Sequence, residues 1–382
     1  MAPGWGAVAD AFLANFDGRG SGRRNDVGAA CCVYVAGRPV VDIWAGTADA
    51  VTGRPWERDT LQLVFSTTKG ATAVCAHLLA QRGALDLDAP IATVWPEFAA
   101  NGKDAISLRT VMSHRAGLAA IDGDLTLADV LAWDPVVEAI AAQAPNWEPG
   151  TLHGYHVRSY GFIVGEVVRR VTGRTIGRFF SDEIATPLGL DFWIGLPAAE
   201  EARVAAIVLP HPGIRELMAA FYPPGSLPGR AMAGPSNLFA YDDMWNEPAL
   251  HAAELPSSNG IGTARAIARM YAATVGPLDG GLGDGVRLLD DTTIADAARE
   301  RSDGPDLITG MPLRIATGFM LAPTLGPSAP VHAFGHSGAG GSLGLADPDS
   351  GIGFGYVMNR MVLGDVDLRA DRIVAAVAGV AG

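Results

Sequence analysis

The chain has 382 residues, of which 49% are hydrophobic and 18% are charged. This composition supplies a sizeable core and excludes a disordered protein, and the length allows one large domain or two to three ordinary ones. The formal net charge of −13 argues against a surface that binds phosphates, so we expect no nucleic-acid partner.

The three cysteines do not suggest a disulfide framework. Cys31 and Cys32 are adjacent and would point to opposite faces of a strand, whereas Cys75 lies in a helical pattern. We expect reduced core residues in a cytoplasmic protein.

The first residues, MAPGWGAVADAFLANF, lack the basic start and long apolar run of a signal peptide. No membrane span is expected either.

Two strand-rich runs about a Gly-Arg-Pro turn, in AACCVYVAGRPVVDIWAG, predict a hairpin near the N-terminus. Helices are predicted for TKGATAVCAHLLAQRGAL, ending at Gly83, and for SYGFIVGEVVRRVTG, ending at Gly173. The polar turn NGKD predicts that Lys103 is a solvated surface charge.

The segment from Leu209 to Pro256 carries eight prolines and many aromatic residues, which is typical of a functional loop or a lid. Further on, GGSLGLADPDSGIGFGYVMN predicts a second hairpin, and the short apolar run IVAAVAGVAG predicts a terminal helix docked on the core.

Strands at both ends with helices between them predict an α+β fold, with one antiparallel sheet built from the two chain ends and flanked by helices. We expect a discontinuous sheet domain over residues 1–95 and 256–382. A mostly helical inserted domain would cover residues 96–255, including the Pro/Gly-rich loop 209–256.

GGSLG, residues 340–344, matches the G-x-S-x-G nucleophile elbow of α/β-hydrolases. An elbow serine needs a helix directly after it and a catalytic histidine further along the chain. Ser342 is followed instead by an Asp-Pro-Asp-Ser-Gly turn, and the last histidine, His336, precedes it. Ser342 is therefore not expected to be a nucleophile.

VFSTTKG places Ser66 and Lys69 in an S-x-x-K arrangement. If a helix begins at Ser66, the lysine lies one turn further on the same face, within reach of the serine hydroxyl. The chain has 28 lysines and arginines, but its only lysines are Lys69 and Lys103. A lysine with a lowered pKa can act as a general base and an arginine cannot. Ser66 is therefore the predicted nucleophile and Lys69 its base.

Tyr155, in PGTLHGYHVRSYGF, stands in a loop just before a predicted helix, a position suited to an active site. An ordinary buried tyrosine is the alternative. His153 and His156 have the spacing of a metal pair, but no carboxylate or cysteine completes a recognisable site around them. Neither a metal nor a cofactor is expected.

Taken together and in order, these motifs resemble the serine β-lactamase and penicillin-binding-protein superfamily, and most closely its family VIII carboxylesterases. VFSTTKG resembles the first motif, SHRAGL the segment that follows it, and PGTLHGYHV the tyrosine motif. In FGHSGAGGSLGLADPDSGIGFGYVMNRM, His336–Gly338 takes the place of the Lys-Thr-Gly of β-lactamases. The resemblance implies a β-lactamase/transpeptidase-like fold and a carboxylesterase.

The resemblance also implies roles for single residues. Ser66 would form the acyl-enzyme, Lys69 and Tyr155 would act as general base and acid, and the backbone amides of Ser66 and Ala339 would bind the oxyanion. Two departures favour an ester over a β-lactam: Val157 stands where class C enzymes have asparagine, and His336 replaces the lysine that holds the β-lactam carboxylate.

The residues expected to bind the substrate come from two parts of the chain. Apart from the third motif (His336, Ser337 and Gly338), the expected pocket wall comes from the aromatic segment, namely Phe221, Tyr222, Phe239 and Trp245. His336 could hydrogen-bond Tyr155 or the substrate, or simply pack in its strand.

The expected reaction is hydrolysis of a small-molecule ester with a small to medium acyl chain. The enzyme alternatives are a β-lactamase or D-amino-acid peptidase, and an amide hydrolase or acyltransferase. The non-enzyme alternative is a protein that binds acyl ligands.

Overall fold

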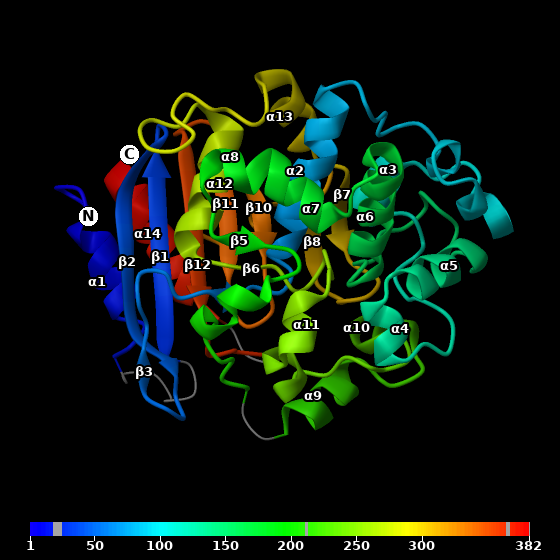
Figure 1. Ribbon diagram of the computed structural model, residues 1–382, viewed down its shortest axis with the longest axis horizontal. Coiled ribbons are helices and arrows are strands. Elements are labelled where there is room, and N and C mark those ends of the chain that lie inside the picture. The colour runs from blue at the N-terminus through cyan, green and yellow to red at the C-terminus, as the bar shows by residue number, and fades with distance from the viewer. Residues whose placement is uncertain (18–24, 211–212, 364–366, 382) are drawn as a thin grey trace.

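The computed structural model describes residues 1–17, 25–210, 213–363 and 367–381. Within these ranges nine strands form one sheet, in the order β3-β2-β1-β12-β11-β10-β9-β8-β7 (Figure 1). The strands are β1 (Gly28–Val35), β2 (Arg38–Asp49), β3 (Arg54–Pro55), β7 (Ser302–Pro305), β8 (Pro312–Ile315), β9 (Met320–Leu321), β10 (Phe334–Ser337), β11 (Leu343–Asp347) and β12 (Ile352–Met358).

The two predicted hairpins meet at the centre of this sheet. β1 and β12 pair antiparallel, with a register that runs from Ala29 opposite Met358 to Val35 opposite Ile352. Every other pairing in the sheet is antiparallel as well. The predicted antiparallel sheet built from both chain ends is therefore confirmed. Ser342 is followed directly by β11 and not by a helix.

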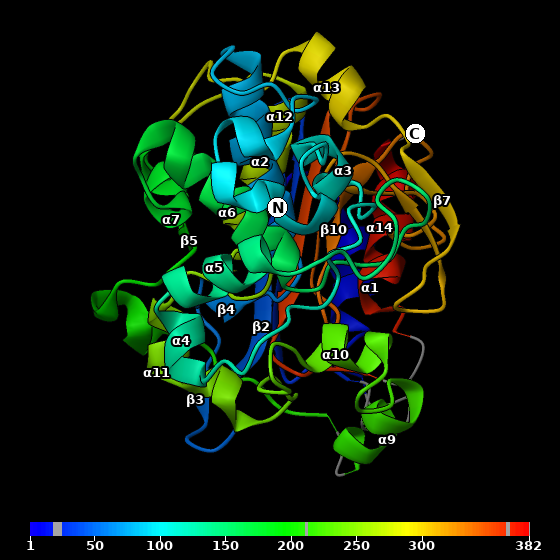
Figure 2. The same cartoon turned by 90° about the vertical axis from the view of Figure 1, so that its right-hand side faces the viewer.

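Helices cover both faces of the sheet (Figure 2). α1 (Gly6–Leu13) and the terminal helix α14 (Arg369–Ala381) pack on one face, and α2 (Thr68–Gln81) and α12 (Ala264–Val275) on the other. Cys31 belongs to the hydrophobic cluster beneath α1 and α14, while Cys32 belongs to the cluster on the opposite face. The expected strand alternation is confirmed, and all three cysteines are free and buried.

α12 lies close to the sheet because β12 offers it glycines. A Cβ atom at Gly355 would stand 2.3 Å from the carbonyl oxygen of Ala264, at the start of this helix. Any other residue at this position would push the helix away from the strand.

Further helices lie to the right in Figure 1, namely α3 (Leu108–Met112), α4 (Leu127–Leu131), α5 (Asp134–Ala142) and α6 (Ser159–Thr172). α7 (Ile176–Phe180) and α8 (Thr186–Leu188) lie nearer the middle of the view, and α13 (Asp291–Ala297) lies at its top. Irregular helical turns join them at η1 (Ile91–Thr93), η2 (Pro96–Gly102), η3 (Ser181–Ala185) and η4 (Ala198–Arg203). A second sheet, in the order β4-β6-β5, consists of β4 (Gln62–Leu63), β5 (Phe192–Trp193) and β6 (Ile261–Gly262).

Two glycines end helices as the sequence predicts. α6 stops at Gly173, which adopts a left-handed conformation with φ 69°. α2 stops one residue before Arg82, and Gly83 has φ 68°. Glycine adopts this conformation without the steric cost that a Cβ atom brings.

The proline-rich segment predicted as a loop contains short helices: α9 (Ile214–Phe221), α10 (Leu227–Ala233), η5 (Asp243–Asn246) and α11 (Pro248–Ala252). Residues 211 and 212 lie outside the described ranges. Prolines stand in the first turn of α10 and of α11, where a missing N–H costs no helical hydrogen bond. Proline enrichment in this segment therefore marks helix starts as well as turns.

Lys103 is buried, contrary to the prediction from the sequence. Its side chain is fully buried, and its amine donates hydrogen bonds to the carbonyl oxygens of Ala100, Ala141 and Gln143. The turn NGKD folds against the end of α5, whose free carbonyls need donors. The prediction of a solvated surface charge is therefore wrong.

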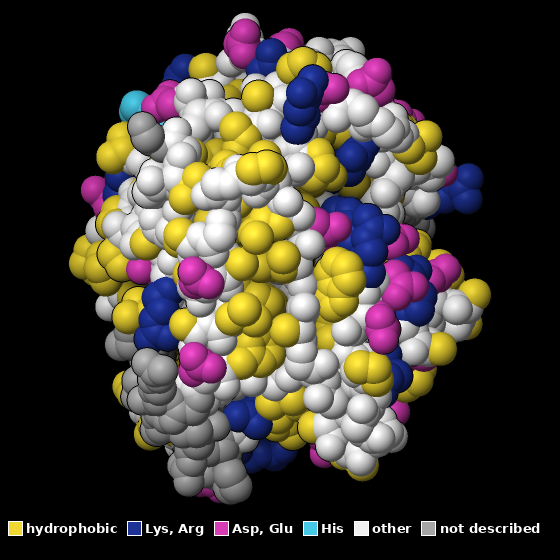
Figure 3. Space-filling view, turned by 90° about the vertical axis from the view of Figure 1, so that its left-hand side faces the viewer, with side chains coloured by type: hydrophobic (Ala, Val, Ile, Leu, Met, Phe, Trp, Pro, Cys, Tyr) yellow, Lys and Arg dark blue, Asp and Glu magenta, His cyan; other side chains and the backbone are white. Residues whose placement is uncertain are grey.

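The face at the left of Figure 1, where β2 is the outermost long strand, carries a band of hydrophobic side chains with charged groups at its margins (Figure 3). β3 pairs with this strand only near Thr47 and Asp49. Across the described ranges, the protein has no helix with the length and apolar character that crossing a membrane requires.

Candidate active site

Ser66 lies in a tight turn just before α2. Phe65, the residue before it, has φ 46°, a left-handed conformation that is unusual for a bulky residue and is often found at functional sites. The helix begins at Thr68, the first residue of the predicted helical segment, and the amide of Lys69 donates to the Ser66 carbonyl oxygen at 2.9 Å. This first turn brings the two side chains of the S-x-x-K motif together.

The Lys69 amine lies 3.1 Å from the Ser66 hydroxyl oxygen. It also donates to the carbonyl oxygens of Val157, at 2.8 Å, and of Ser257, at 3.0 Å. The lysine side chain is fully buried. Burial, assisted by the positive charge of Arg158, lowers its pKa well below the usual range. The amine is therefore disposed to be neutral beside Ser66.

Tyr155 stands in the loop before α6 and faces the same point. Its ring centroid is 4.8 Å from the Lys69 amine, and its hydroxyl is close enough to the Ser66 side chain for hydrogen bonding to affect its pKa. Burial raises the pKa of Tyr155 above its usual value, although the bond to Ser66 opposes that effect. The structure thus brings Ser66, Lys69 and Tyr155 together, with the pKa of the lysine lowered and that of the tyrosine raised.

Two buried histidines hold the Tyr155 loop in place. The backbone amide of His156 donates to His114 Nδ1 at 3.0 Å, and the amide of Leu118 donates to His156 Nε2 at 3.1 Å. The His114 ring lies 4.8 Å from the Tyr155 ring. His156 Nδ1 donates to the Gly154 carbonyl oxygen at 2.6 Å. The SHRAGL segment is therefore bonded directly to the tyrosine motif.

His153 and His156, the pair with metal-like spacing, make separate contacts. His153 Nε2 lies 3.2 Å from the carbonyl oxygen of Gly304, whereas both nitrogens of His156 are engaged by backbone. In the part of the chain that the structure describes, no group of three or more His, Cys, Asp or Glu residues is arranged to hold a metal ion.

The third motif lies at the end of β10. His336 is buried, with its ring 6.1 Å from the Tyr155 ring and its Nδ1 bonded to the Ser337 carbonyl oxygen at 2.7 Å. Its Nε2 has no hydrogen-bond partner among the described residues. Burial lowers the pKa of His336 to about 3, so the imidazole is neutral. Ser337, Gly338 and Ala339 follow at the strand end and are partly exposed.

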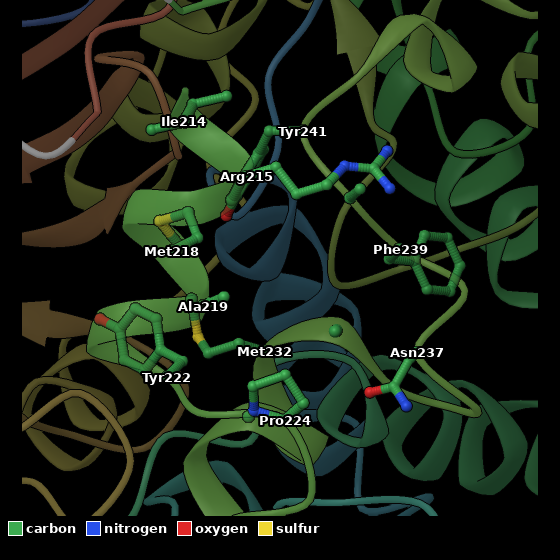
Figure 4. Close-up of a pocket in the computed structure, with 13 residues that line it drawn as sticks. Ile214, Arg215, Met218, Ala219, Tyr222, Pro224, Met232, Asn237, Phe239 and Tyr241 are labelled. Atoms are coloured by element: carbon green, nitrogen blue, oxygen red, sulfur yellow. The ribbon is translucent and has the colours of Figure 1, made fainter. Parts of the chain in front are cut away.

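A cavity of about 340 Å³ lies between α9, α10 and the loop that follows (Figure 4), and the residues that line it do not include Ser66, Lys69 or Tyr155. Its lining is mostly apolar: Ile214, Arg215, Met218, Ala219, Tyr222, Pro224, Gly229, Met232, Ala233, Asn237, Phe239, Ala240 and Tyr241. Tyr241 connects the cavity to the nucleophile turn, because its ring lies 5.9 Å from that of Phe65.

Two of the four aromatic residues expected in a pocket wall, Tyr222 and Phe239, line this cavity. The other two do not. Phe221 is 65% exposed on the outer side of α9. Trp245 is buried behind the cavity, where its ring packs on Phe65 and Phe239 and its indole N–H donates to Ala240.

Sequence reasoning missed three contributors to the site: His114, Arg158 and Ser257. His114 lies within the SHRAGL motif, so its contribution to the site could have been predicted from the sequence. Arg158 is buried, donates to the Met232 carbonyl oxygen at 2.6 Å and stacks on Phe239 at 4.1 Å. Within the described ranges no carboxylate pairs with it. Ser257 binds Lys69 through its carbonyl oxygen, so its residue type carried no signal.

The chain is similar to known proteins over nearly its whole length. A family model described as Beta-lactamase matches residues 12–378. The relative named Esterase/beta-lactamase LipL, from Mycobacterium tuberculosis (strain ATCC 25618 / H37Rv), is 38% identical over 375 residues, covering 94% of this chain and 82% of that protein.

Two solved structures are similar over the whole chain. A family VIII carboxylesterase shares 38% identity with a TM-score of 0.85, covering 100% of this chain and 98% of that one. EstA from Arthrobacter nitroguajacolicus Rue61a shares 34% identity with a TM-score of 0.88, covering 100% and 97%. The predicted resemblance and the β-lactamase/transpeptidase-like fold are thus confirmed, and the chain belongs to the β-lactamase family of serine hydrolases, with carboxylesterases among its neighbours.

Proposed function

We propose that this protein hydrolyses carboxylic esters with small to medium acyl groups, through an acyl-enzyme on Ser66. The observation that carries the proposal is the environment of the Lys69 amine. This amine is fully buried, bonded to two carbonyl oxygens and 3.1 Å from the Ser66 hydroxyl oxygen.

A neutral amine has two N–H donors and one lone pair. The two donors are used by the carbonyl oxygens of Val157 and Ser257. The lone pair is then free to accept the hydroxyl proton of Ser66. In the first step this proton moves to Lys69 as the serine oxygen bonds to the ester carbonyl carbon, and the carbonyl oxygen becomes an oxyanion.

Tyr155 is the proposed proton donor to the leaving alcohol. Burial keeps its hydroxyl protonated, and it can regain a proton from the ammonium that Lys69 has become. Collapse of the tetrahedral intermediate leaves the acyl group on Ser66 and releases the alcohol. Water then attacks the acyl-enzyme with the same pair acting in reverse. No metal or cofactor takes part in these steps.

The oxyanion is proposed to accept hydrogen bonds from the backbone amides of Ser66 and Ala339. One donor of this kind contributes about 3–4 kcal/mol to transition-state stabilisation. The amide of Ser66 belongs to the turn before α2, and the amide of Ala339 follows the end of β10.

Two features favour an ester over a β-lactam. The neutral imidazole of His336 supplies no fixed positive charge for a β-lactam carboxylate, because its pKa is about 3. The cavity beside Tyr241 is mostly apolar and its volume of about 340 Å³ is within the range of small-molecule sites. We propose that it receives the acyl group or the alcohol, and that His336, Ser337 and Gly338 contact the substrate near its carbonyl.

The test compares Ser66→Ala with the wild type on p-nitrophenyl acetate, butanoate and octanoate. We expect the variant to lose hydrolysis of all three esters. A fluorophosphonate should add one mass label to the wild type, on the peptide that contains Ser66. Retained hydrolysis in the variant would overturn the assignment.

Parallel assays separate the alternatives. Nitrocefin turnover faster than ester turnover would favour a β-lactamase. Release of a D-amino acid from a D-amino-acid amide or a D-alanyl peptide would favour an amidase or peptidase, and ester products formed with an added alcohol would favour an acyltransferase. A stable acyl adduct without turnover would favour a binding protein.

A further inference from the structure

Ser342, the serine of GGSLG, is buried against the nucleophile turn and not exposed to substrate. Its side chain is 1% exposed. Its hydroxyl donates to the carbonyl oxygen of Val64 at 2.8 Å, and its oxygen lies 3.1 Å from the Thr67 hydroxyl oxygen. Because the single Ser342 proton is used on Val64, the Thr67 hydroxyl is the donor in the second bond.

These bonds join two segments that are far apart in the sequence. Val64 and Thr67 flank Ser66 on either side, and Ser342 belongs to the turn between β10 and β11, which also contains Ala339. Within that turn the amide of Gly338 donates to the Ser342 carbonyl oxygen at 2.8 Å. Ser342 therefore fixes the turn internally and also fixes it to the nucleophile segment.

The two segments touch so closely that only glycine fits between them. A Cβ atom at Gly338 would lie 2.1 Å from the Val64 carbonyl oxygen and 2.2 Å from the Ser342 hydroxyl oxygen. The contact is thus made by backbone and two hydroxyl groups, without a flexible side chain that could adjust.

We propose that Ser342 is a positioning residue, whose hydroxyl sets the separation of the Ser66 and Ala339 amides that bind the oxyanion. This inference rests on the proposed function, because it needs those two amides to act together. Donors of this kind work only when they are held at hydrogen-bond distance from the developing oxyanion. A shift of about 1 Å at a reacting centre can reduce the rate roughly a hundredfold.

The test uses Ser342→Ala and Thr67→Val, which each remove part of the bridge, and Thr67→Ser, which keeps the hydroxyl. We expect kcat for p-nitrophenyl butanoate to fall about tenfold in the first two variants, with little change in KM. Thr67→Ser should retain most of the activity. Since the two hydroxyls form one chain of hydrogen bonds, the double variant should lose little more than either single variant.

A boronic acid that forms a tetrahedral adduct on Ser66 supplies a readout that does not depend on turnover. Its affinity, measured by calorimetry, should fall in parallel with kcat in Ser342→Ala. Ser350→Ala removes a serine hydroxyl just past the other end of β11 and serves as the matched control. Among the described residues, that hydroxyl bonds only to Asp347. This variant should change neither quantity.

Unchanged kcat and unchanged boronate affinity in Ser342→Ala would overturn the proposal. A fall in melting temperature with unchanged boronate affinity would overturn it as well, because the role would then be structural only. Failure of the proposed function gives a different result, namely hydrolysis that survives Ser66→Ala or a wild type that hydrolyses no ester.

Discussion

Lys69 and Lys103, the two lysines of the chain, are both fully buried, yet their surroundings prepare them for different chemistry. Lys103 has three carbonyl oxygens around its amine, enough to accept all three protons of an ammonium ion. Lys69 has two, and the Ser66 hydroxyl takes the third place. The amine of Lys69 therefore has one carbonyl acceptor fewer than that of Lys103 and contacts the nucleophile instead. This makes Lys69 a candidate base, whereas Lys103 has a structural role.

Arg158 is a buried cation without a carboxylate partner in the described part of the chain, an arrangement that costs stability. Its charge lowers the pKa of Lys69 and favours ionisation of Tyr155. The imidazoles around the site do not supply this charge, because burial keeps the pKa of His156 near 4 and that of His336 near 3. Arg158 is thus suited to keep the lysine neutral.

Arg158→Met should raise the pKa of Lys69, since a nearby positive charge is removed. Lys69 must be neutral to accept the Ser66 proton, so the acid limb of kcat/KM should move to higher pH. The measurement is a pH–rate profile with p-nitrophenyl butanoate, with melting temperatures to confirm folding. Arg178→Met, which removes an exposed charge on α7, should leave the limb in place; an unmoved limb in Arg158→Met would contradict the argument.

Several helices and strands could be predicted from local patterns in the sequence. The helix after Ser66, the helix after Tyr155 and both hairpins follow from periodicity and turn residues. The contact within the S-x-x-K pair could be predicted because both residues lie within one helical turn.

Contacts between distant segments could not be predicted in the same way. The carbonyl oxygens that bind Lys69 belong to residues 88 and 188 positions away. A carbonyl has the same chemistry in every residue, so Val157 and Ser257 carry no signal for this role. Lys103 was misjudged for the same reason, because its burial depends on α5, about 40 positions further along the chain.

The cavity formed by α9 and α10 yields a prediction about chain length. Ala219 lines it, whereas the neighbouring Ala220 is exposed and does not. In Ala219→Trp the indole would occupy space that a long acyl group needs. We expect kcat/KM for p-nitrophenyl octanoate to fall at least about tenfold relative to the acetate, a discrimination of the size expected when a few methylene groups lose their apolar site.

Ala220→Trp is the matched control and should keep the wild-type ratio of octanoate to acetate activity. Equal losses for both esters in Ala219→Trp would point to a disturbed fold or catalytic centre. An unchanged ratio in that variant would show that the acyl chain binds elsewhere.

Across the whole molecule, Arg369 ties the C-terminal helix to the N-terminal segment and to the third motif. Its guanidinium lies 2.7 Å from an oxygen of Asp26 and 2.7 Å from an oxygen of Asp367, and it also donates to the carbonyl oxygen of Gly340. Gly340 directly follows Ala339, one of the proposed oxyanion donors. The last helix of the chain is thereby linked to the active-site turn.

Arg369→Met should lower the free energy of unfolding by about 3–5 kcal/mol at pH 8, because it leaves the buried Asp26 carboxylate with only the Tyr356 hydroxyl as a partner. Burial raises the pKa of Asp26 to about 6 even in the presence of the arginine, and without this cation the pKa must rise further. A protonated Asp26 no longer needs a positive partner. The difference from the wild type should therefore shrink as the pH falls from 8 towards 5.

Urea unfolding at several pH values measures this difference. Arg372→Met, at an exposed position on the same helix, should cost no more than about 0.5 kcal/mol at any of them. A deficit in Arg369→Met that is independent of pH would mean that the arginine does not change the pKa of Asp26. The loss would then come from packing of the arginine side chain and from its bonds to backbone oxygens, and the ion pair would not be what joins the two ends of the chain.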